Sequence, residues 1–223
     1  MKVRMLLLLM AALPLVLSAQ NEVDSNYDRY SYSVNQKIKL AAGVLLVRLE
    51  TKQRKIDLLK EYGYVDEAEI VFSEQKMKNL EIVRSFTEDF TFCPSLFFYS
   101  DHSEEVLHKD FSSPFFLDSN LEIDESIKLS TENYLIAEFG NVQQDTLSVR
   151  EFHYQNGNKR KPSYWGSPNF HFGALVVMSD EFIQLRHPFP NYVRTFDSLP
   201  LFERAIDKTI KRLDKKLLAY SYF

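Results

Sequence analysis

The order of the apolar segments constrains the fold of this chain more than any other feature. A β-branched run over residues 43–49 is followed by two segments with helical spacing, and then by a short apolar run over 96–100. Two strands separated by helices can pair in parallel, because the long connection lets the chain return in the same direction. From residue 115 the pattern becomes extended. Six short strands are expected there, at 115–117, 121–123, 134–139, 147–154, 170–178 and 182–186.

The two helical segments have recognisable ends. Thr51 is expected to cap the first helix and Gly63 to end it. The second is expected to begin near Asp66, which forms a variant capping box with Glu69. Its apolar face has a gap at Lys76. The expected inward positions are Ala68, Phe72, Leu80, Val83, Phe86 and Phe90.

The last helix has the clearest apolar face in the chain. Its inward residues are expected to be Phe202, Ala205, Ile206, Ile210, Leu213, Leu217 and Tyr220. Together these elements predict an α/β fold, in which one domain contains a mixed β-sheet packed by helices. A segregated α+β arrangement is the alternative.

The N-terminus predicts export. Two basic residues precede an uncharged apolar run over 5–17, and small residues lead to Gln20, which is the order of a secretory signal peptide over residues 1–19. An uncleaved anchor is the alternative, although a membrane-spanning helix needs about 20 apolar residues. We expect a flexible lead at 20–33 and a single globular domain at 34–223, with no stable membrane span after cleavage. The expected location is periplasmic or extracellular.

The Ser-Ala-Gln ending of this signal, residues 18–20, and the general texture of the chain resemble uncharacterised exported proteins of Bacteroidota-type bacteria. The resemblance implies export and assigns no catalytic residue.

Charge and cysteine content exclude some classes of function. The formal net charge is −4, and it falls to −6 after removal of a signal with two basic and no acidic residues, so nucleic-acid binding has no electrostatic basis. The single cysteine, Cys93, cannot form an internal disulfide and lies in an apolar segment, where we expect a small buried hydrophobe. A single-thiol enzyme would instead need an exposed Cys93 with a low pKa beside a base.

A possible metal site depends on how two strands pair. If the fourth and fifth extended segments pair antiparallel, the favoured register sets Val149 opposite Leu175 and Leu147 opposite Val177. A slip of one residue would reverse the faces of the side chains.

The same register sets His153 opposite His171, with Glu151 on the same face. Two imidazoles and a carboxylate can hold Zn²⁺ or another transition metal with open positions. Paired histidines bonded to carbonyl groups or water are the structural alternative.

A loop over 158–169 joins these two segments and carries the only tryptophan. Its candidate binding residues are Lys159, Arg160, Tyr164 and Trp165, a combination suited to a glycan or an acidic protein partner. In the structural alternative, Trp165 folds down over the end of the sheet.

The sequence favours an exported soluble protein that binds a partner through this loop, with no catalysis and no cofactor. The alternative function is a metal-dependent enzyme centred on Glu151, His153 and His171. No phosphate-binding glycine loop, nucleophile elbow, zinc-protease motif or calcium loop occurs in the sequence.

Overall fold

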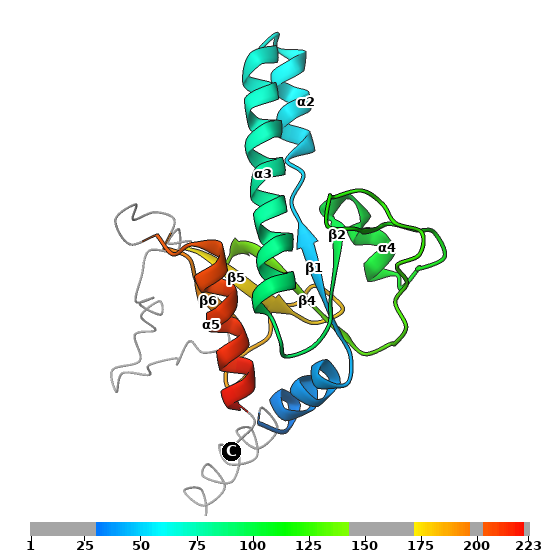
Figure 1. Cartoon of the computed structure of the whole chain (residues 1–223), viewed down its shortest axis with the longest axis vertical. Helices are drawn as coiled ribbons and strands as arrows, with labels where there is room; N and C mark the ends of the chain where they lie inside the picture. The colour runs from blue at the N-terminus through cyan, green and yellow to red at the C-terminus, as the bar shows by residue number, and fades with distance from the viewer. Residues whose placement is uncertain (1–29, 143–171, 197–202, 221–223) are drawn as a thin grey trace, which may run out of the picture.

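A mixed β-sheet lies at the centre of the computed structural model, which describes residues 30–142, 172–196 and 203–220 (Figure 1). Within these residues the sheet has six strands in the order β3-β2-β1-β4-β5-β6. Their bounds are β1 Val44–Leu49, β2 Ser95–Tyr99, β3 Phe116–Leu117, β4 Tyr134–Asn141, β5 Gly173–Met178 and β6 Tyr192–Arg194. β1 pairs in parallel with both β2 and β4, whereas β3, β5 and β6 pair antiparallel with their neighbours.

Helices are interspersed with the strands along the chain. A helix over residues 30–41 precedes β1, and the other described helices are α2 Gln53–Glu61, α3 Val65–Asp89, α4 Ser103–Leu107 and α5 Ile206–Ala219. A short 3₁₀ turn, Ser100–His102, joins β2 to α4. The expected α/β domain with a mixed sheet packed by helices is therefore confirmed.

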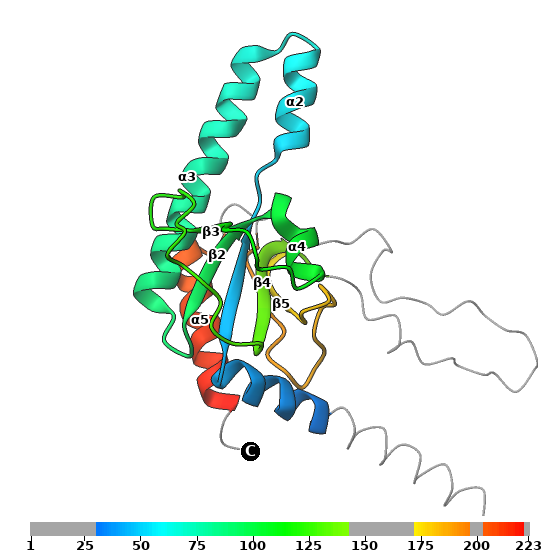
Figure 2. The ribbon, with the colours of Figure 1, turned by 90° about the vertical axis from the view of Figure 1, so that its right-hand side faces the viewer.

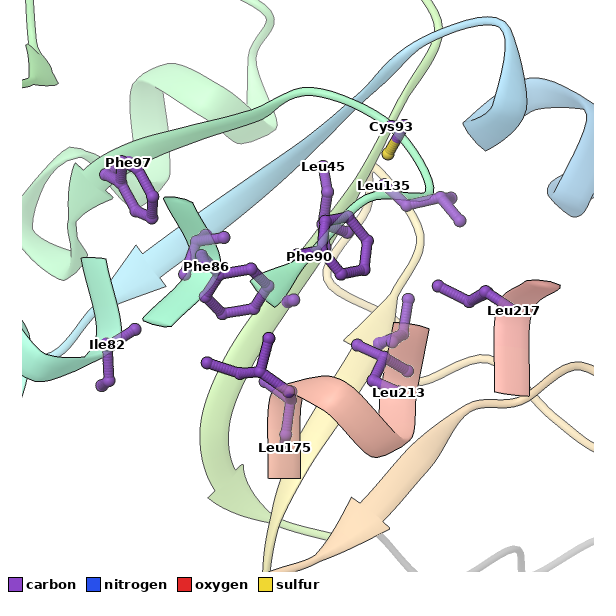
Figure 3. Close-up of a cluster of buried hydrophobic side chains, with 14 of the residues drawn as sticks. Leu45, Ile82, Phe86, Phe90, Cys93, Phe97, Leu135, Leu175, Leu213 and Leu217 are labelled. Carbon is purple, nitrogen blue, oxygen red and sulfur yellow. The ribbon is translucent and has the colours of Figure 1, made fainter. Parts of the chain in front are cut away.

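The alternation of side chains along β1 gives the sheet two apolar faces. Leu45, Val47 and Leu49 are fully buried on the face covered by α3 and α5 (Figures 1 and 3). Leu46 is buried on the opposite face, with Val106 of α4 and a cluster of aromatic rings. Because both faces of β1 are covered, its sequence is almost continuously apolar, as expected of a central parallel strand.

The α5 helix packs largely as its periodicity predicts, except that Ala205, expected inward, is the exposed N-cap, and Phe202 lies outside the described residues. Ile210, Leu213 and Leu217 have no solvent exposure and lie in the core cluster shown in Figure 3. Asp214 is also buried, and its carboxylate accepts hydrogen bonds from the backbone N–H groups of Thr91 and Phe92. Both apolar and polar contacts therefore fix α5 against the end of α3.

The α3 helix follows its predicted period only in part. Val83, Phe86 and Phe90 are buried, and Phe86 packs edge-on against Phe97 of β2 with ring centroids 6.3 Å apart. Phe72, expected inward, is instead 50% exposed. The reason is that the first half of α3 extends with α2 beyond the sheet, where little of the body covers it (Figures 1 and 2). We refer to residues 53–79, which form this projecting helical hairpin, as the arm.

Three predicted helix ends of the arm differ in outcome. Gly63 follows α2 with φ +82°, a left-handed conformation that glycine adopts readily, so its role as terminator is confirmed. Thr51 does not cap α2. The N-cap is Lys52, and its side chain makes no capping hydrogen bond. The capping box at the start of α3 is also wrong, because Tyr64 is the N-cap there and has no side-chain cap.

The N-terminal boundary also differs from expectation. Residues 30–33, assigned to the flexible lead, are helical, and the Ser33 hydroxyl lies 2.6 Å from that of Tyr220. The helical part of the chain therefore begins before residue 34. The predicted signal peptide at 1–19 lies outside the described residues. In the part of the chain that the structure describes, none of the helices combines the length and apolar character needed to cross a bilayer.

Candidate functional site

An open cleft of about 1030 Å³ lies at the carboxyl ends of the three parallel strands. It is lined by residues that follow β1 and β2 and by the last residues of β4. The chain reaches β2 on one side of β1 through α2 and α3, and later reaches β4 on the other side. The strand order therefore reverses at β1. In open α/β sheets such a reversal leaves a crevice at the carboxyl edge, where ligands commonly bind.

An ion pair joins the two strands at this reversal. The Arg48 guanidinium, at the end of β1, lies 2.5 Å from the Glu138 carboxylate of β4. Arg48 Nε also donates a 2.8 Å hydrogen bond to Ser103 Oγ at the start of α4. The ion pair links β1 to β4 at the cleft. Both charged side chains are partly exposed, so they also contribute polar surface to the cleft.

Short polar segments after β1 and β2 meet beside this pair. The Thr51 hydroxyl donates a 2.9 Å hydrogen bond to Asp101 and lies 3.3 Å from the Ser100 hydroxyl. These contacts explain why Thr51 does not cap α2: its hydroxyl is engaged with the neighbouring strand end. They hold the two strand ends together along one side of the cleft.

The first turn of α2 forms a basic wall. Lys52 adopts a left-handed conformation, with φ 54° and ψ 21°, and is followed by Arg54 and Lys55. That turn contains no acidic residue and no side-chain cap. Lys78 of α3 lines the cleft as well. Among the described residues, none of these four cations has an ion-pair partner within 4.0 Å.

The opposite rim is formed by the residues before α5. Arg204 donates hydrogen bonds from its backbone N–H to Thr195 and from its guanidinium to the carbonyl of Arg194. Burial, and secondarily the nearby Arg212, lowers the pKa of the Arg204 guanidinium. Arginine remains charged near neutral pH despite such a shift, so Arg204 adds a fixed positive charge to this rim.

Taken together, the charges that line the cleft are mostly positive. Six are cationic, namely Arg48, Lys52, Arg54, Lys55, Lys78 and Arg204. Four are carboxylates, namely Glu50, Asp101, Glu138 and Glu203. This excess occurs in a chain whose net charge is −4, and it favours an anion at the cleft. The start of α2 adds the positive end of a helix dipole.

The predicted metal site required residues 147–154 to pair with β5, and the structure does not support that pairing. Leu175 of β5 pairs with Phe139 of β4 on one side and with Val193 of β6 on the other. Both edges of β5 are thus occupied at this level, and the expected pairing of Leu175 with Val149 is wrong.

The pairing expected at Val177 fails as well. Its Cα partner in β4 is Ala137, and on the other edge its backbone bonds with Asn191 and Leu185, so Leu147 cannot be the neighbour. The short strand β6, which the sequence pattern does not reveal, occupies the expected position of residues 147–154.

The proposed ligands Glu151, His153 and His171 themselves lie outside the described residues. The same is true of the loop residues Lys159, Arg160, Tyr164 and Trp165. Within the described residues, no group of three or more histidine, cysteine, aspartate or glutamate side chains could hold a metal ion.

Cys93 occupies the position expected of a structural residue. It is 9% exposed and belongs to the core cluster between the sheet, α3 and α5 (Figure 3). Burial raises the pKa of its thiol to about 12. Because the thiolate is the nucleophilic form, this environment opposes a single-thiol mechanism.

Comparison of the chain with protein-family models, with curated proteins and with solved structures finds no match.

Sequence reasoning missed the cleft because its residues are scattered between positions 48 and 206. A signal was nevertheless present. Glu50 and Thr51 follow one apolar run, Ser100 and Asp101 lie at the end of another, and the spacing of the two runs allows them to pair in parallel. Polar residues directly after parallel strands meet at one edge of the sheet.

Proposed function

We propose that this chain is an exported, non-catalytic binding protein whose ligand is a small anion held in the cleft. The observation that carries this proposal is the set of four cations, Lys52, Arg54, Lys55 and Lys78, without ion-pair partners among the described residues. They line a crevice at the point where the strand order reverses. A carboxylate or phosphate group would balance these charges and accept hydrogen bonds from the start of α2.

The binding loop expected from the sequence is compatible with this proposal. Asn141 and Gly173, which lie just before and just after the segment that contains it, both line the cleft. A loop carrying Lys159 and Arg160 would favour the same acidic ligand or partner as the cleft does.

Export is part of the same proposal, and the signal peptide predicted at residues 1–19 from their sequence is the reason for it. Mass spectrometry of the protein recovered from the cell envelope or the medium should show a chain that begins at Gln20, or at Ala19 if the cleavage site moves by one residue. An intact Met1 in that fraction would contradict cleavage.

Titration with simple anions tests the binding site. Inorganic phosphate and citrate should shift the backbone NMR signals of residues 51–55 and 100–101 saturably, and the affinity should fall with added salt. A Lys52→Gln/Lys55→Gln variant should bind about tenfold more weakly, because two of the unpaired charges are lost. The matched control is Lys215→Gln on the exposed face of α5, which should not change the affinity. Absence of saturable shifts at the cleft with either anion would refute the proposed ligand class.

A further inference from the structure

The arm carries half of the large hydrophobic side chains that are exposed among the described residues. Fourteen large hydrophobic side chains are exposed among the described residues, and seven of them lie between positions 58 and 77. They are Leu58, Tyr62, Tyr64, Val65, Ile70, Phe72 and Met77, with exposed fractions of 44–73%. Clustered exposure of this kind marks an interaction surface more often than scattered exposure does. The arm also projects from the body, so a partner can approach it from the side (Figures 1 and 2).

The charges on the arm are separated along its length. The outer half, residues 58–69, has four acidic side chains and one lysine: Lys60, Glu61, Asp66, Glu67 and Glu69. The inner half, formed by residues 53–57 and 70–79, has four cations and two acids: Arg54, Lys55, Asp57, Glu74, Lys76 and Lys78. The formal charges of the outer and inner halves are therefore −3 and +2.

This separation makes the arm complementary to a second arm that runs in the opposite direction. In a two-fold arrangement, the acidic outer half of each arm lies beside the basic inner half of the other. The stretch from Val65 to Lys78 spans about 20 Å of helix, which sets the length of overlap. A parallel arrangement would instead place like charges together.

We propose that the arm is a self-association surface, through which two copies of the chain pair antiparallel. Apolar side chains that are exposed in the single chain become buried between the two arms of the dimer. The opposite charges determine that the arms run antiparallel and how far they overlap. The inference shares the cations Arg54, Lys55 and Lys78 with the proposed anion site, but the acidic side chains of the outer half of the arm do not line the cleft, so variants of those side chains separate the two proposals.

Sedimentation equilibrium of the protein purified after export tests this pairing. The wild-type protein should form dimers at concentrations up to about 100 μM, and added salt should weaken them. Glu67→Lys/Glu69→Lys should weaken the dimer at least about tenfold, because each reversal occurs twice in a symmetric pair. Arg54→Glu/Lys55→Glu should do the same. All four residues are exposed, so circular dichroism should show an unchanged fold.

The decisive experiment combines the two reversals. The quadruple variant restores opposite charges in swapped positions, and its dimer should recover to within about threefold of the wild type. The control is Glu125→Lys, an exposed change outside the arm, which should leave association unchanged. A wild-type protein that stays monomeric at every concentration would overturn the inference. The inference would also be overturned if neither charge reversal weakened the dimer, or if the quadruple variant did not recover the dimer affinity. Anion binding at the cleft can then be measured in the monomeric variant Glu67→Lys/Glu69→Lys, which keeps every cleft cation.

Discussion

The two halves of α3 share one helix but have different surroundings. From Ile82 to Phe86 the helix packs against the sheet and α5, and the exposures of Ile82, Val83 and Phe86 are 1–3%. From Val65 to Asn79 it lies in the arm, where Ala68 is the only fully buried apolar residue it contributes. The inward positions Gln75 and Asn79 of this half are amides.

These amides show how the arm is held. Gln75 donates a 2.9 Å hydrogen bond to Asn79, which in turn donates one of 2.9 Å to the carbonyl of Glu50 after β1. The body half of α3 is thus stabilised mainly by burial of large apolar side chains, and the arm half by packing against α2, where Ile56 and Ala68 are buried, and by a few polar contacts. Helical periodicity is present in both halves, so continuity of a helix does not imply uniform stability.

The largest difference in the free energy of unfolding should come from matched truncations of one phenylalanine in each half of α3. Phe86→Ala removes a buried ring that contacts Phe90 and Phe97, and should lower the free energy of unfolding by about 3–5 kcal/mol. Phe72→Ala removes a half-exposed ring and, in the unpaired Glu67→Lys/Glu69→Lys background, should change it by less than about 0.5 kcal/mol. Urea unfolding of both variants measures the contrast, and equal losses would show that the arm is packed as tightly as the body.

A smaller effect is expected where α5 holds the end of α3. Asp214→Ala removes the acceptor for the N–H groups of Thr91 and Phe92, and should cost about 1–2 kcal/mol. Asp214→Asn, which retains one side-chain oxygen, is the matched control and should cost less. Urea unfolding again gives the measurement. If Asp214→Ala did not change the free energy of unfolding, water would replace these hydrogen bonds without loss of stability.

The smallest effect concerns a charged contact on the surface of the body. Asp180 lies 3.2 Å from Lys39 and 3.0 Å from Lys109. Burial raises the pKa of Asp180, but hydrogen bonds and charge attraction from these two lysines outweigh it, so the pKa falls below 3.8. The contribution is therefore present above pH 3.8 and is lost as the pH falls through the lowered pKa.

Asp180→Asn should accordingly cost about 0.5–1 kcal/mol at pH 7, and the difference from wild type should shrink at pH 3. Urea unfolding at the two pH values measures it. Glu88→Gln, which removes the exposed partner of Arg84 on α3, should cause no measurable change. If the stability difference between wild type and Asp180→Asn grew as the pH was lowered, the pKa of Asp180 would not be lowered in the folded protein.

Sequence patterns predicted β1, β2, β4, β5 and α5, but the strands expected at 121–123 and 182–186 are wrong, because only isolated bridges form there, at Ile123 and Gln184. The apolar runs of β1, β2, β4 and β5 and the amphipathic face of α5 each contain enough burial to determine their own structure. The three-residue strand β6 has too few residues for a visible alternation, yet it decides which strands lie beside β5. Pairing is a property of the whole sheet, and a local pattern does not encode it.

The same distinction explains what was missed in the arm and the cleft. Phe72 fits the helical period of α3, but the period does not say whether a body lies opposite that face. Arg48 and Glu138 each interrupt an apolar strand, and only the parallel pairing of β1 with β4 brings them together. A site whose residues come from the ends of different strands can be identified only when the strand order is known.

Native-state hydrogen exchange along α3 tests the contrast between its two halves most directly. It should be measured in the Glu67→Lys/Glu69→Lys variant, so that pairing of arms does not protect the arm. Amides of residues 82–89 should exchange only through global unfolding, with protection equal to the full stability measured in urea. Amides of residues 69–78 should exchange through local opening, with protection at least about tenfold lower. Equal protection along the whole of α3 would contradict this account.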